Sequence, residues 1–200
     1  MTTHYFECNI LGTDNPPEFI LGKLYKNIHG ILSEKELTNI GISFPQMDKR
    51  PGRDIRLFSD QKTLSGIHAN PGIQFFVKSG AINVSDIQPV PKKHSLATFA
   101  RIRIAEKTTD LYALKSELRF VKHLAKKGIE IDENKLKDHR KKIIARRKKV
   151  IPFLLMHSKS TQRDFPLFLE KEEVDSQGPG SGFNFYGLSN RGAPVAVPVF

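Results

Sequence analysis

Three places in the sequence combine residue types that can do chemistry. His29 offers an imidazole, which both accepts and donates a proton near neutral pH. Ser158, Ser160 and Thr161 form a cluster of hydroxyls, and Tyr186 adds a phenol. Each also has an ordinary explanation, because most lone surface histidines have no role, hydroxyls often satisfy hairpin turns and strand tyrosines are often half-buried. The residue types permit acid–base chemistry without establishing it.

The position of His29 favours a functional role. We expect it near the C-terminal end of a helix, where the helix dipole favours the charged imidazolium. Gly30 follows it and leaves room for a ligand.

No pattern in the sequence predicts a metal site or a cofactor. Cys8 is the only cysteine, the seven histidines are scattered, and no acidic cluster suggests bound magnesium. A single cysteine also excludes an internal disulfide and suits a reducing cytosol. If the protein cuts RNA, we therefore expect the ribose 2′-hydroxyl to be the nucleophile, with acid–base help from side chains.

The positive charge of the chain is concentrated in one quarter of it. Residues 101–149 hold 17 Lys and Arg against seven Asp and Glu, while the whole chain has a formal charge of +11. The sequence pI is about 9.8. A basic segment of this kind favours a nucleic-acid partner.

Within that segment, residues 110–127 predict an amphipathic helix. Its apolar residues recur at helical spacing and are expected to face a core: Leu111, Leu114, Leu118, Val121 and Ala125. Four cations recur with the same period about a quarter-turn away and form what we call the basic ridge: Lys115, Arg119, Lys122 and Lys126. A solvated face of mixed charge is the ordinary alternative. The ridge holds no acid, which favours a polyphosphate partner instead.

The remaining composition predicts a cytoplasmic protein without a membrane segment. Apolar residues make up 38% of the 200-residue chain, which includes 14 Phe, so the chain can bury a core. No apolar run approaches the length of a membrane span, and the N-terminus lacks a signal-peptide pattern.

The N-terminal half predicts a βαββαβ order, typical of ferredoxin-like domains, which RNA-recognition domains also use. The expected strands lie at residues 4–11, 40–44, 55–57 and 82–84, with one helix at residues 16–32 and a short one after Asp60 that ends at Asn70-Pro71-Gly72. Prolines at 89 and 91 mark a linker, so we expect domains at 1–92 and 93–200.

The C-terminal half adds a second basic segment at residues 132–149 and then strands. We expect residues 151–156 and 165–169 to form a hairpin, residues 171–182 to form a loop, and residues 183–188 and 195–200 to form short strands. The predicted fold class is α+β, with a ferredoxin-like domain and a smaller domain that carries the basic helix and the hairpin.

Four stretches, taken in order, resemble the type I-F CRISPR repeat-processing endoribonucleases. They are residues 24–32 (LYKNIHGIL) with 39–45 (NIGISFP), residues 99–103 (FARIR), residues 151–161 (IPFLLMHSKST) with 165–168 (FPLF), and residues 182–189 (GFNFYGLS). Each stretch is weak alone, whereas four in the same order are specific.

The resemblance implies an active site. His29 falls on the catalytic histidine that takes the proton from the 2′-hydroxyl, and Ser158 falls on the serine that holds the ribose of the cleaved nucleotide. Tyr186 matches an accessory active-site tyrosine, and Ser160 and Thr161 would lie beside the scissile phosphate.

The resemblance also implies RNA contacts. Arg101 matches an arginine that binds a guanine edge in the major groove of the hairpin. Lys115, Arg119 and Lys122 match an arginine-rich helix lying along that groove, and Phe165 matches an aromatic that stacks under the last base pair.

Two positions depart from the family pattern. Arg103 stands where a glutamine is frequent, and the natural target of arginine is guanine O6 and N7. Lysines replace some arginines of the helix, so point charges stand where bidentate groups are usual.

The resemblance implies that the protein binds the stem-loop of CRISPR repeat RNA, cuts on its 3′ side, and stays on the product with the other subunits of a type I-F interference complex. The alternative from another class is a non-catalytic protein that binds structured RNA in a ribosome or another ribonucleoprotein. A catalytic His29 with Ser158 favours the enzyme, whereas an idle histidine favours the binding protein.

Overall fold

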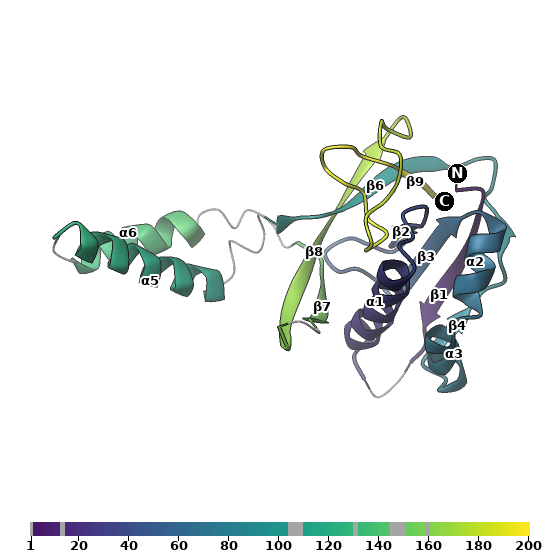
Figure 1. The fold of residues 1–200 in the computed structure, drawn as a ribbon, viewed down its shortest axis with the longest axis horizontal. Helices are drawn as coiled ribbons and strands as arrows, with labels where there is room; N and C mark the ends of the chain where they lie inside the picture. Colours follow the sequence, from purple (N-terminus) through teal and green to yellow (C-terminus); the bar gives the residue numbers. More distant parts are fainter. Residues whose placement is uncertain (1, 13–14, 104–109, 130–131, 145–150, 159–160) are drawn as a thin grey trace. The chain divides into compact units, whose positions relative to one another are not determined.

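The computed structural model describes residues 2–12, 15–103, 110–129, 132–144, 151–158 and 161–200 (Figure 1). The chain forms two compact units, one of Met1–Arg101 with Pro152–Phe200 and one of Ile102–Ile151. The sequence predicted a division near residue 92, whereas the strands on both sides of that position belong to the first unit.

The first unit begins with an antiparallel sheet and three helices. Its elements are β1 (His4–Ile10), α1 (Pro17–Glu34), β2 (Gly41–Ser43), β3 (Asp54–Ser59), α2 (Gln61–His68), α3 (Pro71–Lys78), β4 (Ile82–Val84) and β5 (Gln88–Pro89). The strand order is β2-β3-β1-β4, β5 pairs with β1, and each pair is antiparallel. The predicted α+β class is confirmed, and this strand order is the one expected of a βαββαβ ferredoxin-like chain.

The period of the apolar residues explains β1 and α1. The inward residues of both elements are buried: Phe6, Cys8 and Ile10 on β1, and Ile20, Leu24, Ile28 and Ile31 on α1. Burial raises the pKa of the Cys8 thiol to about 12, so this group is a neutral part of the core.

One helix more than expected lies between β3 and β4. Asp60 caps α2 as predicted, because its side chain accepts a hydrogen bond from Thr63 N. Asn70 was expected only to help end this helix, but its side chain accepts from Gly72 N and caps α3. Asparagine followed by proline is a helix start signal as well as a turn signal, since Pro71 needs no hydrogen bond in the first turn.

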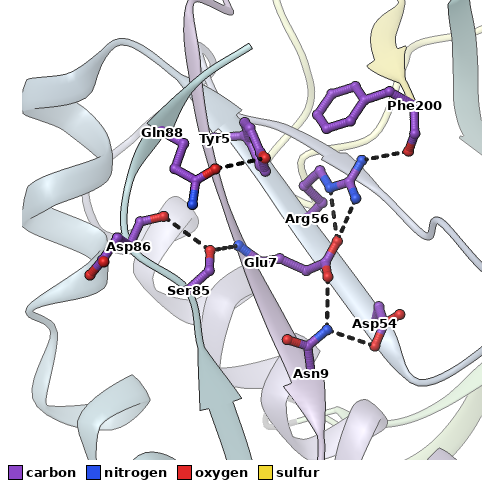
Figure 2. A network of polar contacts seen from close by, with 9 residues as sticks. All are labelled: Tyr5, Glu7, Asn9, Asp54, Arg56, Ser85, Asp86, Gln88 and Phe200. Atoms are coloured by element: carbon purple, nitrogen blue, oxygen red, sulfur yellow. Dashed lines mark hydrogen bonds and ion pairs between the residues drawn. The ribbon is translucent and has the colours of Figure 1, made fainter. Parts of the chain in front are cut away.

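The alternate side chains of β1 form a polar network with β3 (Figure 2). Glu7 accepts from Arg56 Nε at 2.9 Å and from Asn9 Nδ2 at 2.8 Å, and Asn9 Nδ2 also donates to Asp54. The Arg56 guanidinium lies 4.1 Å from the centre of the Phe200 ring. RNA-recognition domains stack bases on aromatic residues of such a sheet. Here the Tyr5 and Phe200 rings share the face with two carboxylates, and Arg56 lies over both rings.

A second antiparallel sheet completes the first unit. Its strands are β6 (Ser95–Arg101), β7 (Phe153–Ser158), β8 (Arg163–Val174) and β9 (Val197–Val199), in the order β7-β8-β6-β9. The predicted hairpin is confirmed as β7 and β8, which pair from Phe153↔Phe168 to Ser158↔Arg163. Two predictions are wrong: β8 continues to Val174 into the expected loop, and residues 183–188 form no strand.

A side chain explains why residues 183–188 turn back. Asn184 Oδ1 accepts hydrogen bonds from Tyr186 N at 2.9 Å and from Leu188 N at 3.3 Å, so it replaces a strand partner. Gly187 lies at φ +68°, where a residue without a Cβ is favoured. We call residues 184–188 the C-terminal loop.

The C-terminal segments share one core with the first sheet. The Phe44 and Phe99 rings lie 6.1 Å apart. Gly41 on β2 is in such close contact with Val197 and Phe183 that a Cβ would overlap both side chains. Segments from both ends of the chain therefore hold each other in place.

The second unit contains two described helices, α5 (Asp110–Lys126) and α6 (Glu133–Ile144). Glu117 forms an ion pair with Arg140, whose Nη2 lies 2.7 Å from Glu117 Oε1. The Phe120 and His139 rings stack with centres 4.5 Å apart.

The predicted helix at residues 110–127 is confirmed, but the face that it buries is not the predicted one. Leu114 and Leu118 are 54% and 56% exposed, whereas Ala113 and Leu124 are buried with Glu117. The ion pair with α6 explains the difference, because it turns the side of α5 that carries Glu117 toward α6. The side chain of Leu111 lies outside the described residues.

In the part of the chain that the structure describes, no helix combines the length and the apolar character that crossing a membrane requires.

Candidate active site

His29 lies half-buried on α1, with its Nδ1 2.8 Å from the carbonyl oxygen of Phe185. A carbonyl oxygen only accepts hydrogen bonds, so Nδ1 carries the proton in this pair. The neutral ring then has its lone pair on Nε2, and that nitrogen can take a proton from a substrate. The geometry therefore suits a general base.

Two aromatic rings support the imidazole. The Tyr186 ring is stacked on His29, with centres 3.9 Å apart and planes 7° apart. Tyr25 lies stacked 6.4 Å from Tyr186, and its hydroxyl donates to the Tyr186 carbonyl oxygen at 2.7 Å. Burial raises the pKa of the Tyr25 hydroxyl well above its ordinary value, Tyr186 adds to this, and the Arg101 guanidinium opposes it. Tyr25 is therefore a neutral donor within reach of the Arg101 charge.

The C-terminal loop that carries Phe185 and Tyr186 is fixed at several points. Ile42 N donates to Gly187 O at 2.8 Å, and Asn184 N donates to Leu188 O at 2.9 Å. The partners of His29 are thus held before any substrate arrives, which is the arrangement that favours catalysis.

The expected effect of the helix end on His29 is wrong. α1 continues to Glu34, so His29 lies outside the last turn, where the dipole effect is concentrated. A Cβ added at Gly30 would meet nothing within 4 Å, so the space there is open, and its use by a ligand stays a prediction.

Ser158 ends β7, and its hydroxyl oxygen accepts a hydrogen bond from Thr161 N at 3.2 Å. This contact satisfies the hairpin turn, as the ordinary explanation of the hydroxyl cluster requires. Ser160 lies outside the described residues. α1 packs directly on β7, since a Cβ on Gly22 would lie 2.5 Å from the Leu155 carbonyl oxygen. The direct approach of Ser158 to His29 stays a prediction.

Three of the predicted residues share one face of the second sheet. The strand registers Ser158↔Arg163, Met156↔Phe165 and Arg101↔Leu169 show this, because paired residues point to the same face and side chains alternate along each strand. The side chains of Ser158, Phe165 and Arg101 therefore lie on one face. The Arg101 guanidinium lies 5.6 Å from the centre of the Phe165 ring. Since this face includes the buried Leu169, it faces the core that α1 completes.

The other predicted RNA-binding residues lie in the second unit. Arg103, Lys115, Arg119 and Lys122 are all exposed, so the basic ridge faces solvent as expected. Arg119 donates from Nε to the Lys115 carbonyl oxygen at 3.3 Å and lies 5.4 Å from the Tyr112 ring centre.

Sequence reasoning missed three residues of this site. Tyr25 has the helical spacing of a core residue next to Leu24 and Ile28, and nothing in the sequence shows its hydroxyl contact. Asn184 and Phe185 were assigned to a strand, so their contacts with the turn and with His29 were not expected.

Among the residues that the structure describes, no group of three or more His, Cys, Asp or Glu side chains could hold a metal ion.

Comparison with known proteins decides the family. The model of the family "CRISPR-associated protein (Cas_Csy4)" matches residues 5–200. The chain belongs to the Csy4 family. A curated relative, "CRISPR-associated endonuclease Cas6/Csy4" of Escherichia coli (strain UTI89 / UPEC), is 25% identical over 98% of this chain and 99% of its own length. A second relative with the same description, from Pseudomonas aeruginosa (strain UCBPP-PA14), is 22% identical over 94% of this chain and 96% of its own. The match of this Csy4-family chain thus includes both the His29 site and the second unit.

Proposed function

We propose that this Csy4-family protein is an endoribonuclease that binds the stem-loop of CRISPR repeat RNA and cuts on its 3′ side. The observation that carries the proposal is the setting of His29, whose Nδ1 is held by the Phe185 carbonyl oxygen so that Nε2 is available as a base. The description of both relatives as CRISPR-associated endonucleases supports the activity.

The reaction needs no metal in this proposal. His29 Nε2 takes the proton from the ribose 2′-hydroxyl, and the 2′-oxygen forms a bond to the adjacent phosphorus. The bond from phosphorus to the 5′-oxygen of the next nucleotide breaks, and that oxygen takes a proton from water and leaves as a 5′-hydroxyl. The proton that His29 took up is then released to the solvent. The other product is a 2′,3′-cyclic phosphate, or the 3′ phosphate formed from it by water.

The remaining residues bind and orient the RNA. Ser158 holds the ribose of the cleaved nucleotide, Thr161 and Ser160 lie beside the scissile phosphate, and Tyr186 keeps the imidazole plane fixed. Two separate contacts support this assignment: Tyr186 stacks on His29, and Ser158 contacts Thr161.

Recognition of the stem falls to Arg101, Phe165 and the second unit. Arg101 binds a guanine edge, Phe165 stacks under the last base pair, and Arg103 with the basic ridge contacts the groove. The exposure of the ridge supports this, since four cations without an acid attract phosphates. We further propose that the protein stays on the cut RNA in the cytoplasm with other subunits of an interference complex.

One experiment tests the activity. The protein is incubated with a short repeat hairpin in EDTA, and the ends of the products are determined. We expect cutting at the 3′ side of the stem, with a 5′-hydroxyl and a cyclic or 3′ phosphate. A 2′-deoxy sugar at the cut should abolish cleavage and leave binding nearly unchanged. A strict requirement for magnesium would overturn the mechanism, and tight binding without any cutting would favour the non-catalytic alternative.

A further inference from the structure

Phe185 is an exposed aromatic residue whose backbone holds the candidate base. Its own carbonyl oxygen is the hydrogen-bond partner of His29 Nδ1, and its side chain is 40% exposed. Exposing a large apolar side chain to water costs free energy, which burial in the core would remove.

Packing of the loop does not explain this ring. Phe183 and Leu188, on either side of it, are 6% and 0% exposed and belong to the core. Tyr186 also packs against the core and supports His29. Phe185 is not part of that core cluster, so Phe183, Tyr186 and Leu188 anchor the loop without it.

The backbone that carries the ring is already ordered. Asn184 Oδ1 accepts from Tyr186 N, Gly187 N donates to Asn184 O at 2.8 Å, and the Tyr25 hydroxyl holds the Tyr186 carbonyl oxygen. An aromatic side chain on a fixed backbone loses little conformational freedom when a ligand stacks on it. Unpaired RNA bases are the ligands that stack on such rings.

We propose that Phe185 stacks on the base of the first unpaired nucleotide on the 3′ side of the scissile phosphate. This inference rests on the proposed function. In the proposed function Phe165 stacks on the stem side of the cut, so Phe185, whose backbone holds His29, is left for the single strand that follows. Fixing that nucleotide holds its leaving 5′-oxygen in line with the attacking 2′-oxygen, which a free strand does only rarely. Phe185 is thus a positioning residue.

Single-turnover cleavage at saturating protein tests the inference. Phe185→Ala should slow cutting of a hairpin with one unpaired 3′ nucleotide by about 5- to 100-fold, the range of a lost base–aromatic stack. Phe185→Trp should restore most of the rate. Phe75→Ala is the matched control, because Phe75 is 68% exposed on α3, and it should cut like the unchanged protein.

An abasic site at the unpaired nucleotide separates stacking from support of His29. The unchanged protein should lose about the same factor on abasic RNA, and Phe185→Ala should lose nothing more. Equal losses for Phe185→Ala on normal and abasic RNA would overturn the inference, as would an unchanged rate.

A binding measurement tests the stacking on Phe185 even if the protein does not cut the RNA. Both hairpins carry a 2′-deoxy sugar at the cut, and one of them lacks the base of the unpaired nucleotide. The unchanged protein should bind the hairpin that has this base at least about five-fold more tightly, because one stacking interaction contributes that much binding energy. Phe185→Ala should lose this preference, and a preference that survives in the variant overturns the inference. If the unchanged protein binds but never cuts, the proposed activity fails while this comparison still stands.

Discussion

A hydrogen bond to a backbone carbonyl gives His29 a defined role, because it leaves Nε2 as the nitrogen that meets the substrate. His94 makes the same kind of bond, with its Nδ1 2.7 Å from the Pro91 carbonyl oxygen, and it is exposed on the surface. The tautomer alone therefore does not make a site. What distinguishes His29 is the Tyr186 ring stacked on it, which Tyr25 supports in turn.

Replacing His29 should remove the base without removing the binding surface. We expect His29→Ala to lower the cleavage rate by about two to four powers of ten, the usual scale of a lost acid–base group. Hairpin affinity should change little, since one imidazole is minor beside the basic ridge. His94→Ala is the control and should cut normally. A His29→Ala protein that is folded and cuts at the normal rate would contradict the assignment.

Arg101 should control selectivity more than affinity. We expect Arg101→Ala to lose about 1–3 kcal/mol of preference for the cognate stem over one with a swapped base pair near its foot, because a bidentate guanine contact is lost. Competition binding with the two stems measures this preference. Equal losses on both stems would instead make Arg101 a phosphate contact.

At the scale of elements, α5 carries different chemistry on each side. One side holds Glu117 and the Phe120 ring, which meet α6, and another holds the basic ridge. This arrangement leaves the cations in water, where phosphates can reach them.

The basic ridge should produce a strong salt dependence of binding. Each cation that meets a phosphate releases a counterion, so Lys115→Ala and Lys122→Ala should each reduce the salt slope by about one and weaken all hairpins alike. Lys62→Ala, an exposed lysine on α2, is the control. If slope and affinity stay the same in both ridge variants, the ridge is only a solvated surface.

The Glu117–Arg140 pair should make the α5–α6 hairpin sensitive to acid. The hydrogen bond from Arg140 lowers the pKa of Glu117 below its ordinary value of 4.5. The pair therefore stabilises the hairpin above about pH 4.5 and loses this effect as the pH falls through the lowered pKa of the folded state. Helical circular dichroism from pH 7 to pH 3 should fall more in the unchanged protein than in Glu117→Gln. Glu133→Gln is the control, because its pair with Lys137 is exposed.

At the scale of the whole molecule, the first unit joins segments from both ends of the chain. Gly187 shows how closely they meet, because a Cβ there would lie 2.5 Å from Ile42 Cγ1 on β2. The loop that orients His29 therefore leaves no room for a larger residue at this position.

Gly187→Ala should destabilise the fold and disturb the site together. The left-handed φ and the overlap with Ile42 should lower the free energy of unfolding by at least about 1 kcal/mol, measured by urea denaturation. Cleavage should slow in the folded fraction as well. Gly66→Ala on α2 is the control, since an added Cβ there meets nothing within 4 Å, and it should be neutral or stabilising.

The sequence by itself determined the local elements and the chemistry available to them. Periodic apolar residues predicted β1, α1 and α5, because helices and strands bury side chains at fixed spacings. A fully apolar run at residues 151–156 predicted the first strand of the β7–β8 hairpin. The ordered stretches around His29, Ser158 and Tyr186 carried the family resemblance, and the family match confirmed it.

Only the tertiary structure decided what surrounds those residues. The partner of His29 is Phe185, 156 residues further along the chain, and no periodicity relates positions so far apart. Their contact depends on how the C-terminal loop packs on α1 and β2, and that packing follows from the shared core of Gly41, Val197 and Phe183. For the same reason the buried side of α5 was mistaken: a helix with both an apolar stripe and an acid can bury either, and the ion pair with Arg140 on another helix made the choice.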